Sequence, residues 1–406
     1  MVKLTSIYLG VAAALVSYSS FSMDEVSAEM GMSQPEFDAV QSSIISAREI
    51  SRRAEEYNGR PYRRDAHAKA TGCVRATFTV NPDIPERFQQ SLFSKVGHEY
   101  PSWIRFSNGD MLVQADKKGD ARGMAIKVMN VEGDPIAPEL GHSGNQDFIM
   151  TNVPAFFNRN IFDYAEDMLF LAKFERTKWF ISFFPPRFHP KQFYRAVQTV
   201  TTVINTPLDA QYFSMLPYQL GSNAIKFSTR PCQGMEFPSK VDKSPENYLN
   251  TQLQNQLLNG DACFEFMVQE KLTGHYMPID DATVIWSEKA SPFIPIATVY
   301  IPPQLINSPE QTEFCENVSM NPWRAVGEWE PLGSLNKARR LVYKAVSDYR
   351  HMMNKATVPE PTSWCLKENQ TEKCKMERII SSTPDWSWKR DFDYLAKPLD
   401  GNKDFY

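Results

Sequence analysis

The sequence contains several short segments in which apolar and polar residues alternate, and this pattern limits the fold more than any other feature of the chain. Alternation places every second side chain on the same face of a β-strand, so each segment predicts a strand with one buried face. The segments are residues 76–80, 103–107, 124–128, 263–268, 282–286 and 297–301. Strands, an insertion of helices and further strands predict an α+β fold built on an antiparallel sheet or barrel.

Helical segments are expected before the strands and between their two groups. Residues 23–60 are polar and rich in Glu, Arg and Ala, which predicts a helical leader with a helix starting just after Pro35. Residues 158–202 are rich in aromatic residues and arginine, and a Phe-Phe-Pro-Pro stretch at 183–186 interrupts them. Because proline cannot continue a helix interior, this region is expected to form helices broken by proline.

A further helix is expected after the last strands. Apolar residues recur at helical spacing between 335 and 354, and Ser334 is the expected N-cap. Beyond residue 357 the sequence is rich in proline and charge, which is typical of a tail that lies on a domain or is partly disordered. The predicted organisation is therefore one domain over residues 61–355 and a tail over residues 356–406.

The N-terminus has the pattern of a targeting segment. Lys3 is followed by an apolar run to about Val16 and by a Ser-rich stretch that ends near Ser22. This predicts a secretory signal peptide over residues 1–22 and a protein that is exported, either secreted or periplasmic. An uncleaved membrane anchor is the alternative, although the apolar run is short for a membrane span.

The cysteines also fit export. There are six, and an even number is typical of an oxidising compartment. Cys365 and Cys374 are close in sequence and near the glycosylation sequons that begin at Asn317 and Asn369, so a small C-terminal disulfide loop is expected. The other four can be either disulfide-bonded or scattered buried thiols: Cys73, Cys232, Cys263 and Cys315.

Charge and motif content exclude several classes of function. Lys and Arg total 44 against 48 Asp and Glu, a formal net charge of −4, so no bulk positive field indicates a nucleic-acid partner. The histidines and cysteines do not have the spacing of a zinc site. Residues 141–145 lack the final glycine of a nucleophile elbow, and the sequence has no glycine-rich phosphate loop. A hydrolase is therefore not expected.

The predicted helix over residues 335–354 places two arginines and a tyrosine on one line. Arg339, Tyr343 and Arg350 fall within roughly 40° of arc, at about 100° per residue, beside the apolar stripe. The Arg339 charge favours loss of the Tyr343 proton, whose pKa is normally about 10, and ligation of haem iron by a phenolate requires that loss. Arg350 is about 10 Å further along the axis, a separation suited to a haem propionate. The alternative is an amphipathic helix whose arginines flank the core.

Five short motifs follow one another between residues 64 and 350. The first is Arg-Asp-Ala-His-Ala-Lys at 64–69, the second is Arg-Phe-Ser at 105–107, and the third is Gly-Asp-Ala-Arg-Gly-Met-Ala-Ile-Lys at 119–127. The fourth is Gln-Asp-Phe-Ile-Met-Thr-Asn-Val-Pro-Ala-Phe-Phe at 146–157, and the fifth is the Arg-x-x-x-Tyr of the predicted helix with its further arginine. In this order the motifs resemble those of the catalase family, over roughly residues 60 to 355.

The resemblance implies a role for each matching residue around a haem. Tyr343 is the implied proximal ligand of the iron, with Arg339 stabilising its phenolate. His67 is the implied distal acid/base, and Ser107 fixes the orientation of its imidazole. Asn152 is expected to hydrogen-bond the peroxide substrate.

The remaining carried-over residues concern the haem itself. Arg64, Arg105 and Arg350 are implied to pair with the propionates, since the guanidinium group is planar and always charged. Phe157 resembles a family phenylalanine near the ring. The activity implied is decomposition or reduction of a small peroxide, as in a catalase or peroxidase, by a protein that can be oligomeric.

The sequence also departs from the family pattern. Ala70 stands where the family usually has Gly, Ala66 where catalases usually have Val, and the usual Asp-Thr pair between Tyr343 and Arg350 is missing. The tail has no recognisable nucleotide-binding module. The chain thus resembles a small divergent branch that includes allene oxide synthases, and two alternatives stay open: a fatty-acid hydroperoxide isomerase or lyase, and a non-catalytic secreted haem-binding protein. The phenylalanines between 156 and 194 fit either a lipid channel or an ordinary core.

Overall fold

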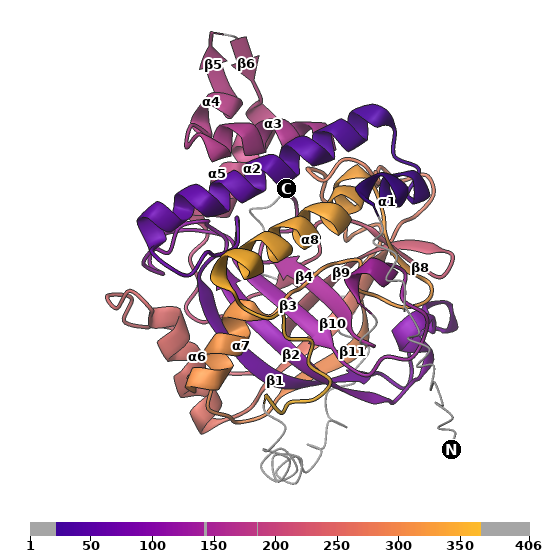
Figure 1. Ribbon diagram of the computed structural model, residues 1–406. Helices are drawn as coiled ribbons and strands as arrows, with labels where there is room; N and C mark the ends of the chain where they lie inside the picture. The colour runs from indigo at the N-terminus through magenta and orange to yellow at the C-terminus, as the bar shows by residue number, and fades with distance from the viewer. Residues whose placement is uncertain (1–21, 142–143, 185, 367–406) are drawn as a thin grey trace, which may run out of the picture.

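The computed structural model describes residues 22–141, 144–184 and 186–366, and an antiparallel β-barrel lies at its centre (Figure 1). The barrel strands are β1 (Ala70–Val80), β2 (Glu99–Asn108), β3 (Arg122–Val128), β4 (Gln146–Thr151), β7 (Tyr212–Phe213), β9 (Asn223–Pro231), β10 (Ala262–Glu270) and β11 (Ile294–Ile301). Within the described residues these eight strands run in the order β10-β11-β1-β2-β3-β4-β7-β9, and β9 pairs with β10 to close the ring. Two short strands, β8 (Tyr218–Leu220) and β12 (Trp329–Pro331), continue from β9. The predicted α+β fold is confirmed, and its sheet is a closed barrel.

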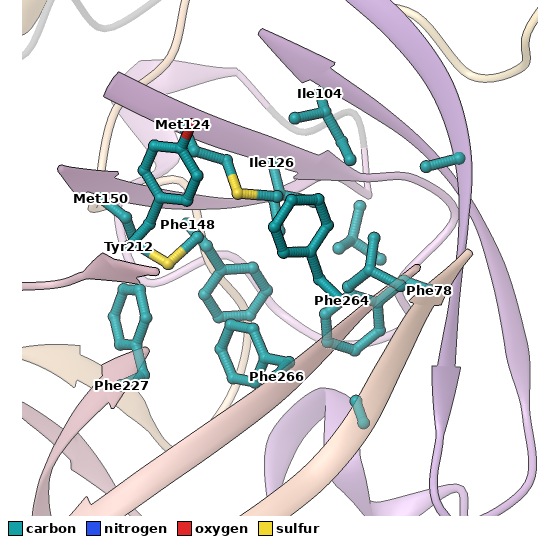
Figure 2. Close-up of a cluster of buried hydrophobic side chains, with 14 of the residues drawn as sticks. Phe78, Ile104, Met124, Ile126, Phe148, Met150, Tyr212, Phe227, Phe264 and Phe266 are labelled. Atoms are coloured by element: carbon teal, nitrogen blue, oxygen red, sulfur yellow. The ribbon is translucent and has the colours of Figure 1, made fainter. Parts of the chain in front are cut away.

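Aromatic side chains fill the interior of the barrel (Figure 2). Along β1, Ala76, Phe78 and Val80 are fully buried while the threonines between them are partly exposed, as the alternation predicts. The ring of Phe148 on β4 lies 5.8 Å from that of Phe78 and 4.8 Å from that of Phe266 on β10, measured between centroids. Because such rings remove a large apolar area from water, they form the main hydrophobic core of the protein.

Five of the six predicted strands are confirmed, within β1, β2, β3, β10 and β11. The sixth prediction is wrong, because residues 282–286 form a turn and an irregular segment. The Asp281 carboxylate accepts hydrogen bonds from the backbone N–H and the hydroxyl of Thr283. Such a local bond offers the backbone an alternative to a strand ladder. Trp286 is buried here and its indole N–H donates to the carbonyl of Pro278, so the apolar alternation reflects a buried loop.

Helices pack on the outside of the barrel (Figure 1). The α-helices are α1 (Met23–Glu29), α2 (Gln34–Asn58), α3 (Ile161–Ala172), α4 (Thr177–Phe180), α5 (Pro190–Thr201), α6 (Tyr248–Asn259), α7 (Pro309–Asn317) and α8 (Ser334–Asn354), and short 3-10 helices span Glu86–Phe88, Ser91–Ser94 and Pro138–Leu140. The expected helix after Pro35 is confirmed as α2, which packs against α3 and α8. Val40 and Ile44 of α2 share an apolar cluster with Leu341 and Val342 of α8.

The structure confirms helices on both sides of the proline-containing stretch, and it corrects the predicted N-cap of the last helix. The proline-containing interruption is a two-stranded hairpin of β5 (Ile181–Phe183) and β6 (Pro186–Phe188), with α3 and α4 before it and α5 after it. Pro186 is tolerated there because each strand of an isolated hairpin has a free edge. Gly333, not Ser334, is the N-cap of α8, with a φ of 86° that favours glycine. Ser334 instead donates its hydroxyl to the Asp280 carboxylate.

Two disulfides lie within the described residues. Cys73 of β1 is bonded to Cys315 of α7, and Cys232 is bonded to Cys263 of β10. The interpretation of these four residues as scattered thiols is therefore wrong. The first bond fixes the C-terminal end of α7 against the barrel wall.

Parts of the chain for which the sequence made predictions lie outside the described residues. These are residues 1–21, which make up nearly all of the predicted signal peptide, and residues 367–406, which include Cys374, the proposed partner of Cys365. The described start of the tail packs on the barrel, where the Trp364 indole N–H lies within hydrogen-bonding distance of the carbonyls of Ala76 and Ser102. No helix in the described part of the chain has both the length and the apolarity to cross a membrane.

Replacing Cys73 and Cys315 together with alanine is expected to lower the free energy of unfolding by about 3–5 kcal/mol. The bond joins residues 242 positions apart, against 31 for the Cys232–Cys263 bond, so its loss gives the unfolded chain more conformational freedom. The free energy of unfolding should therefore fall by about 2 kcal/mol more in the Cys73/Cys315 variant than in the Cys232/Cys263 variant. Denaturant unfolding compares the two, and equal losses would contradict the loop-length argument.

Candidate functional site

A cavity lies between helix α8 and strands β2, β3 and β4, and it is lined by residues from all four elements. Residues 64–67, Tyr164 of α3 and the loop at 319–320 complete the lining. The space between these side chains is about 850 Å³, part of which is open to solvent.

Tyr343 reaches the cavity from α8, and its hydroxyl is held by an arginine one turn earlier. The Arg339 guanidinium donates to the Tyr343 Oη at 3.3 Å, to the Tyr218 Oη at 3.1 Å and to the Asn336 Oδ1 at 3.0 Å. Burial alone lowers the pKa of Arg339, but the Tyr343 and Tyr218 phenols outweigh it and raise the pKa above its usual value. The predicted neighbours Arg339 and Tyr343 are thus joined by a hydrogen bond, with Tyr343 at the cavity wall.

His67 enters the same cavity from the segment before β1. Its Nδ1 lies 3.0 Å from the Ser107 Oγ of β2, so the structure brings the two predicted residues together. The backbone of His67 has a φ of 57°, and such strained conformations cluster at functional sites. A Cβ on Gly123 of β3 would lie 2.6 Å from the His67 Nδ1, so glycine is required where the imidazole crosses the strand.

The imidazole of His67 is uncharged at neutral pH. Burial, and then the charges of Arg105, Arg64 and Arg339, lower its pKa to about 4. A neutral ring can accept a proton, and the positive surroundings favour passing that proton on. His67 therefore has the state that a general acid/base needs.

The three arginines expected at the propionates meet at the C-terminal end of α7. Arg350 and Arg64 both donate to the Glu316 carbonyl, at 2.8 and 3.1 Å, and Arg105 donates to the Cys315 carbonyl at 3.3 Å. Burial, followed by repulsion from neighbouring arginines, lowers the pKa of Arg105 and of Arg350 well below its usual range. A group of buried cations that disfavour one another's charge is suited to binding an anion, because the anion would relieve the repulsion.

Asn152 and Phe157 lie outside the cavity lining. The Asn152 side-chain oxygen accepts a hydrogen bond of 2.6 Å from the backbone N–H of Arg122, which ties the end of β4 to the start of β3. Phe157 packs against Phe156 and Phe180, and the Arg176 guanidinium lies over its ring. The proposed contacts of Asn152 with peroxide and of Phe157 with haem stay predictions.

The structure adds residues that sequence reasoning did not single out. Tyr164 lines the cavity from α3, and burial followed by the charge of Asp65 raises its pKa well above 10, so its phenol stays protonated. Asp65 also lines the cavity, and burial raises its pKa to about 6. Asp65 lies inside the first motif, at residues 64–69, so the sequence could have indicated it as a site residue. Tyr164 and the loop residue Ser319 carry no local signal.

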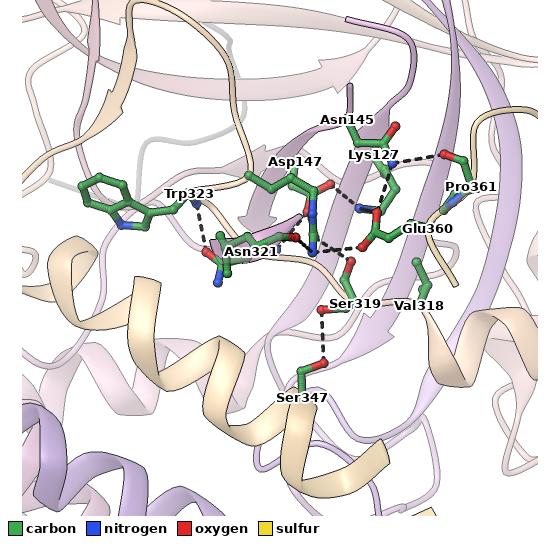
Figure 3. Close-up of polar contacts among 12 residues, drawn as sticks. Lys127, Asn145, Asp147, Val318, Ser319, Asn321, Trp323, Ser347, Glu360 and Pro361 are labelled. Carbon is green, nitrogen blue, oxygen red and sulfur yellow. Dashed lines mark hydrogen bonds and ion pairs between the residues drawn. The ribbon is translucent and has the colours of Figure 1, made fainter. Parts of the chain in front are cut away.

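A buried network of charges holds the 319–320 loop at the cavity (Figure 3). The Asp147 carboxylate accepts from Lys127 at 2.9 Å and from Arg324 at 2.7 Å, and the side chains of Asp147 and Lys127 are fully buried. Arg324 also donates to the Ser319 carbonyl at 3.0 Å. The Ser347 hydroxyl of α8 lies 3.2 Å from the Ser319 hydroxyl. The network therefore joins strands β3 and β4 to α8 through one wall of the cavity.

Comparison with known proteins gives a consistent assignment. The sequence model of the catalase family matches residues 54–169. A catalase of the Onchocerca volvulus endobacterium is 24% identical over 257 residues, which cover 57% of this chain and 50% of that protein. Catalase A of Pseudomonas putida is 36% identical over 98 residues, which cover 24% of this chain and 18% of that protein. The chain thus spans half or less of the length of these relatives.

Solved structures show the same fold. A fungal catalase matches with a TM-score of 0.56 and 17% identity, covering 72% of this chain and 60% of that one. Catalase A from Saccharomyces cerevisiae matches with a TM-score of 0.58 and 17% identity, covering 75% of this chain and 66% of that one. A closed antiparallel barrel with packed helices therefore defines a protein of the catalase-like fold class. Residues 54–169 are similar in sequence to the catalase family, and the curated relatives that match this chain are catalases.

The imidazole of His67 is expected to stay uncharged between pH 5 and 7, because its pKa is about 4. An ordinary histidine, with a pKa of about 6.5, gains its proton in that window. Since folding lowers this pKa, the contribution of His67 to stability is lost as the pH falls from about 6.5 to about 4.

Histidine-selective NMR measures this directly. One resonance should titrate near pH 4 and be missing from the spectrum of the His67→Gln variant. A His67 resonance that titrates near pH 6.5 would mean that the ring is solvated and not held in the cavity.

Proposed function

We propose that this protein is a haem-dependent enzyme that decomposes peroxide. The observation that carries the proposal is the meeting of Tyr343, His67 and the three buried arginines in one cavity of a catalase-like barrel. The donor set fits a haem: a phenol beside a buried guanidinium for the iron, and cations at one edge for the carboxylates. Relatives that are named catalases add support.

In this proposal some cavity residues hold the haem and others move a proton. Tyr343 binds the iron as a phenolate, which Arg339 stabilises, and Arg64, Arg105 and Arg350 pair with the propionates. The haem, when bound, supplies the redox chemistry for cleavage of the oxygen–oxygen bond. With the Nδ1–H of His67 donated to the Ser107 Oγ, the Nε2 accepts a proton from one peroxide oxygen and returns it to the other.

Hydrogen peroxide is the substrate that we propose, with a catalatic or peroxidatic outcome. Oxygen evolution from hydrogen peroxide, measured beside loss of the ultraviolet absorbance of a fatty-acid hydroperoxide, tests this choice. Oxygen release supports a catalase, and oxidation of an added donor supports a peroxidase. Conversion of the fatty-acid hydroperoxide alone would instead indicate an isomerase or lyase, and haem binding without turnover would indicate a non-catalytic haem protein.

We further propose that the protein is exported. Two disulfides in the described fold support this, because such bonds persist in oxidising compartments and are rare in the cytosol. Expression of the full chain followed by fractionation and N-terminal sequencing tests the proposal, with cleavage near residue 22 as the expected result.

Replacing Tyr343 with phenylalanine is expected to abolish or strongly weaken haem binding, because the phenolate oxygen that holds the iron is lost. The measurement is the Soret absorbance after expression with excess haem. Tyr349→Phe is the matched control, since Tyr349 is on the same helix but packs on Tyr62 away from the cavity. Full haem content in the Tyr343 variant would refute the assignment of the iron ligand.

Replacing His67 with alanine is expected to leave haem content unchanged and to reduce peroxide turnover by about 10²- to 10⁴-fold, the usual contribution of general acid/base help. The measurement is the initial rate of hydrogen peroxide consumption per bound haem. Turnover that stays within a few-fold of the native rate would show that another group moves the proton.

A further inference from the structure

The β5–β6 hairpin exposes large aromatic side chains at its tip. Phe183, Phe184 and Phe188 are 95%, 94% and 73% exposed. Figure 1 shows the hairpin projecting away from the barrel, beyond helices α2 and α3. Single exposed apolar residues need no explanation, but neighbouring ones that protrude together mark an interaction site.

The base of the hairpin is anchored, so the tip is held out by the fold. Trp179 is fully buried and stacks on the His189 ring at 4.8 Å between centroids. Its indole N–H donates to the Glu166 carboxylate of α3, which also pairs with Arg187. Residues on both sides of the tip are therefore held against α3 and against each other.

Helix α5 continues the apolar surface. Phe193, Val197 and Val200 follow at positions i, i+4 and i+7, which places them on one face of the helix, and they are 42%, 38% and 55% exposed. Every residue of α5 is at least partly exposed. We call the exposed residues of the hairpin and of this helix face the hairpin surface.

Positive charge surrounds the hairpin surface. Residues 173–195 contain six basic residues and one acidic residue, in a chain whose net charge is −4. Two of their acidic partners from other elements lie deeper: Lys191 is 53% exposed and Asp281 17%, and Arg176 is 35% exposed and Asp167 0%. Glu166, the partner of Arg187, is 36% exposed against 22% for the arginine. The most exposed of these paired charges are the lysines Lys178, at 58%, and Lys191. Exposed aromatic rings beside basic residues are typical of segments that bind at the surface of an anionic lipid bilayer.

We propose that the hairpin surface docks the protein on anionic lipid membranes. Phe183 and Phe184 enter the interface between headgroups and acyl chains, and Lys178 and Lys191 meet the lipid phosphates. A projecting tip is poorly suited to a stable protein partner, which requires roughly 800 Å² from each side. The three tip phenylalanines alone, without the α5 face, supply less than this, at about 150–250 Å² each.

Vesicle sedimentation of the full, purified protein tests this proposal. The native protein should sediment with phosphatidylglycerol-containing vesicles and bind phosphatidylcholine vesicles at least several-fold more weakly. The Phe183→Ser/Phe184→Ser variant should bind the anionic vesicles at least tenfold more weakly, because it loses two inserted rings. Lys178→Glu/Lys191→Glu should lose the preference for anionic lipid. Docking requires neither haem nor turnover, so the result is independent of the proposed function.

The matched control is Leu305→Ser, which removes an exposed apolar side chain, 67% accessible, from the loop between β11 and α7. It should bind vesicles like the native protein, and circular dichroism should show that all variants are folded. Native protein that stays in the supernatant would overturn the proposal, as would a Phe183/Phe184 variant that binds as tightly as native. A native dimer that these two substitutions convert to a monomer without lipid would also overturn it, and would assign the surface to a second copy.

Discussion

Closure of the barrel by the pairing of β9 with β10 is the constraint on which the rest of the structure depends. The pairing runs from Ile225 opposite Glu270 to Pro231 opposite Phe264 and leaves the ring without a free edge. Because side chains alternate along each strand, a closed ring fixes which of them point inward. On β2, Ile104 and Phe106 enter the core, and the alternate residues Arg105 and Ser107 reach the cavity under α8. The core and the site are thus two faces of the same strands.

Buried positive charge organises the site. Arg64, Arg105 and Arg350 are placed by the carbonyls at the end of α7, whose position the Cys73–Cys315 bond fixes on the barrel. Burial, and then the charges of Arg105, Arg64 and Arg339, keep His67 neutral, and Arg339 also holds the hydroxyl of Tyr343. Burying these cations costs free energy, and binding of an anionic group would lower that cost and stabilise the folded protein. The propionates of the proposed haem are such anionic groups.

How much the sequence could predict differed between elements. Local patterns predicted the strands within β1, β2, β3, β10 and β11, because burial on one face of a strand requires alternation. The same pattern gave a wrong prediction at residues 282–286. There the Asp281 carboxylate accepts a hydrogen bond from the Thr283 N–H and stabilises a turn, and Trp286 is buried although it lies in a loop. The cavity partners Tyr164 and Ser319 were missed because their role comes from packing between elements far apart in the sequence. The aromatic residues near 183 fitted a core or a channel, and the structure places those of the hairpin tip in solvent.

The sequence by itself determined the alignment of Arg339, Tyr343 and Arg350, since helical periodicity is a local property that needs no partner. The order of its motifs also gave the resemblance to catalases, and a family match over residues 54–169 agrees with it. Tertiary structure decided that His67 faces the same cavity as Tyr343, that its ring is neutral and that Asn152 bonds the start of β3. These features depend on distances and burial between segments that meet only in the folded chain, such as Asn152 and Arg122, which are 30 residues apart, and His67 and Ser107, which are 40 apart. A linear pattern does not encode them.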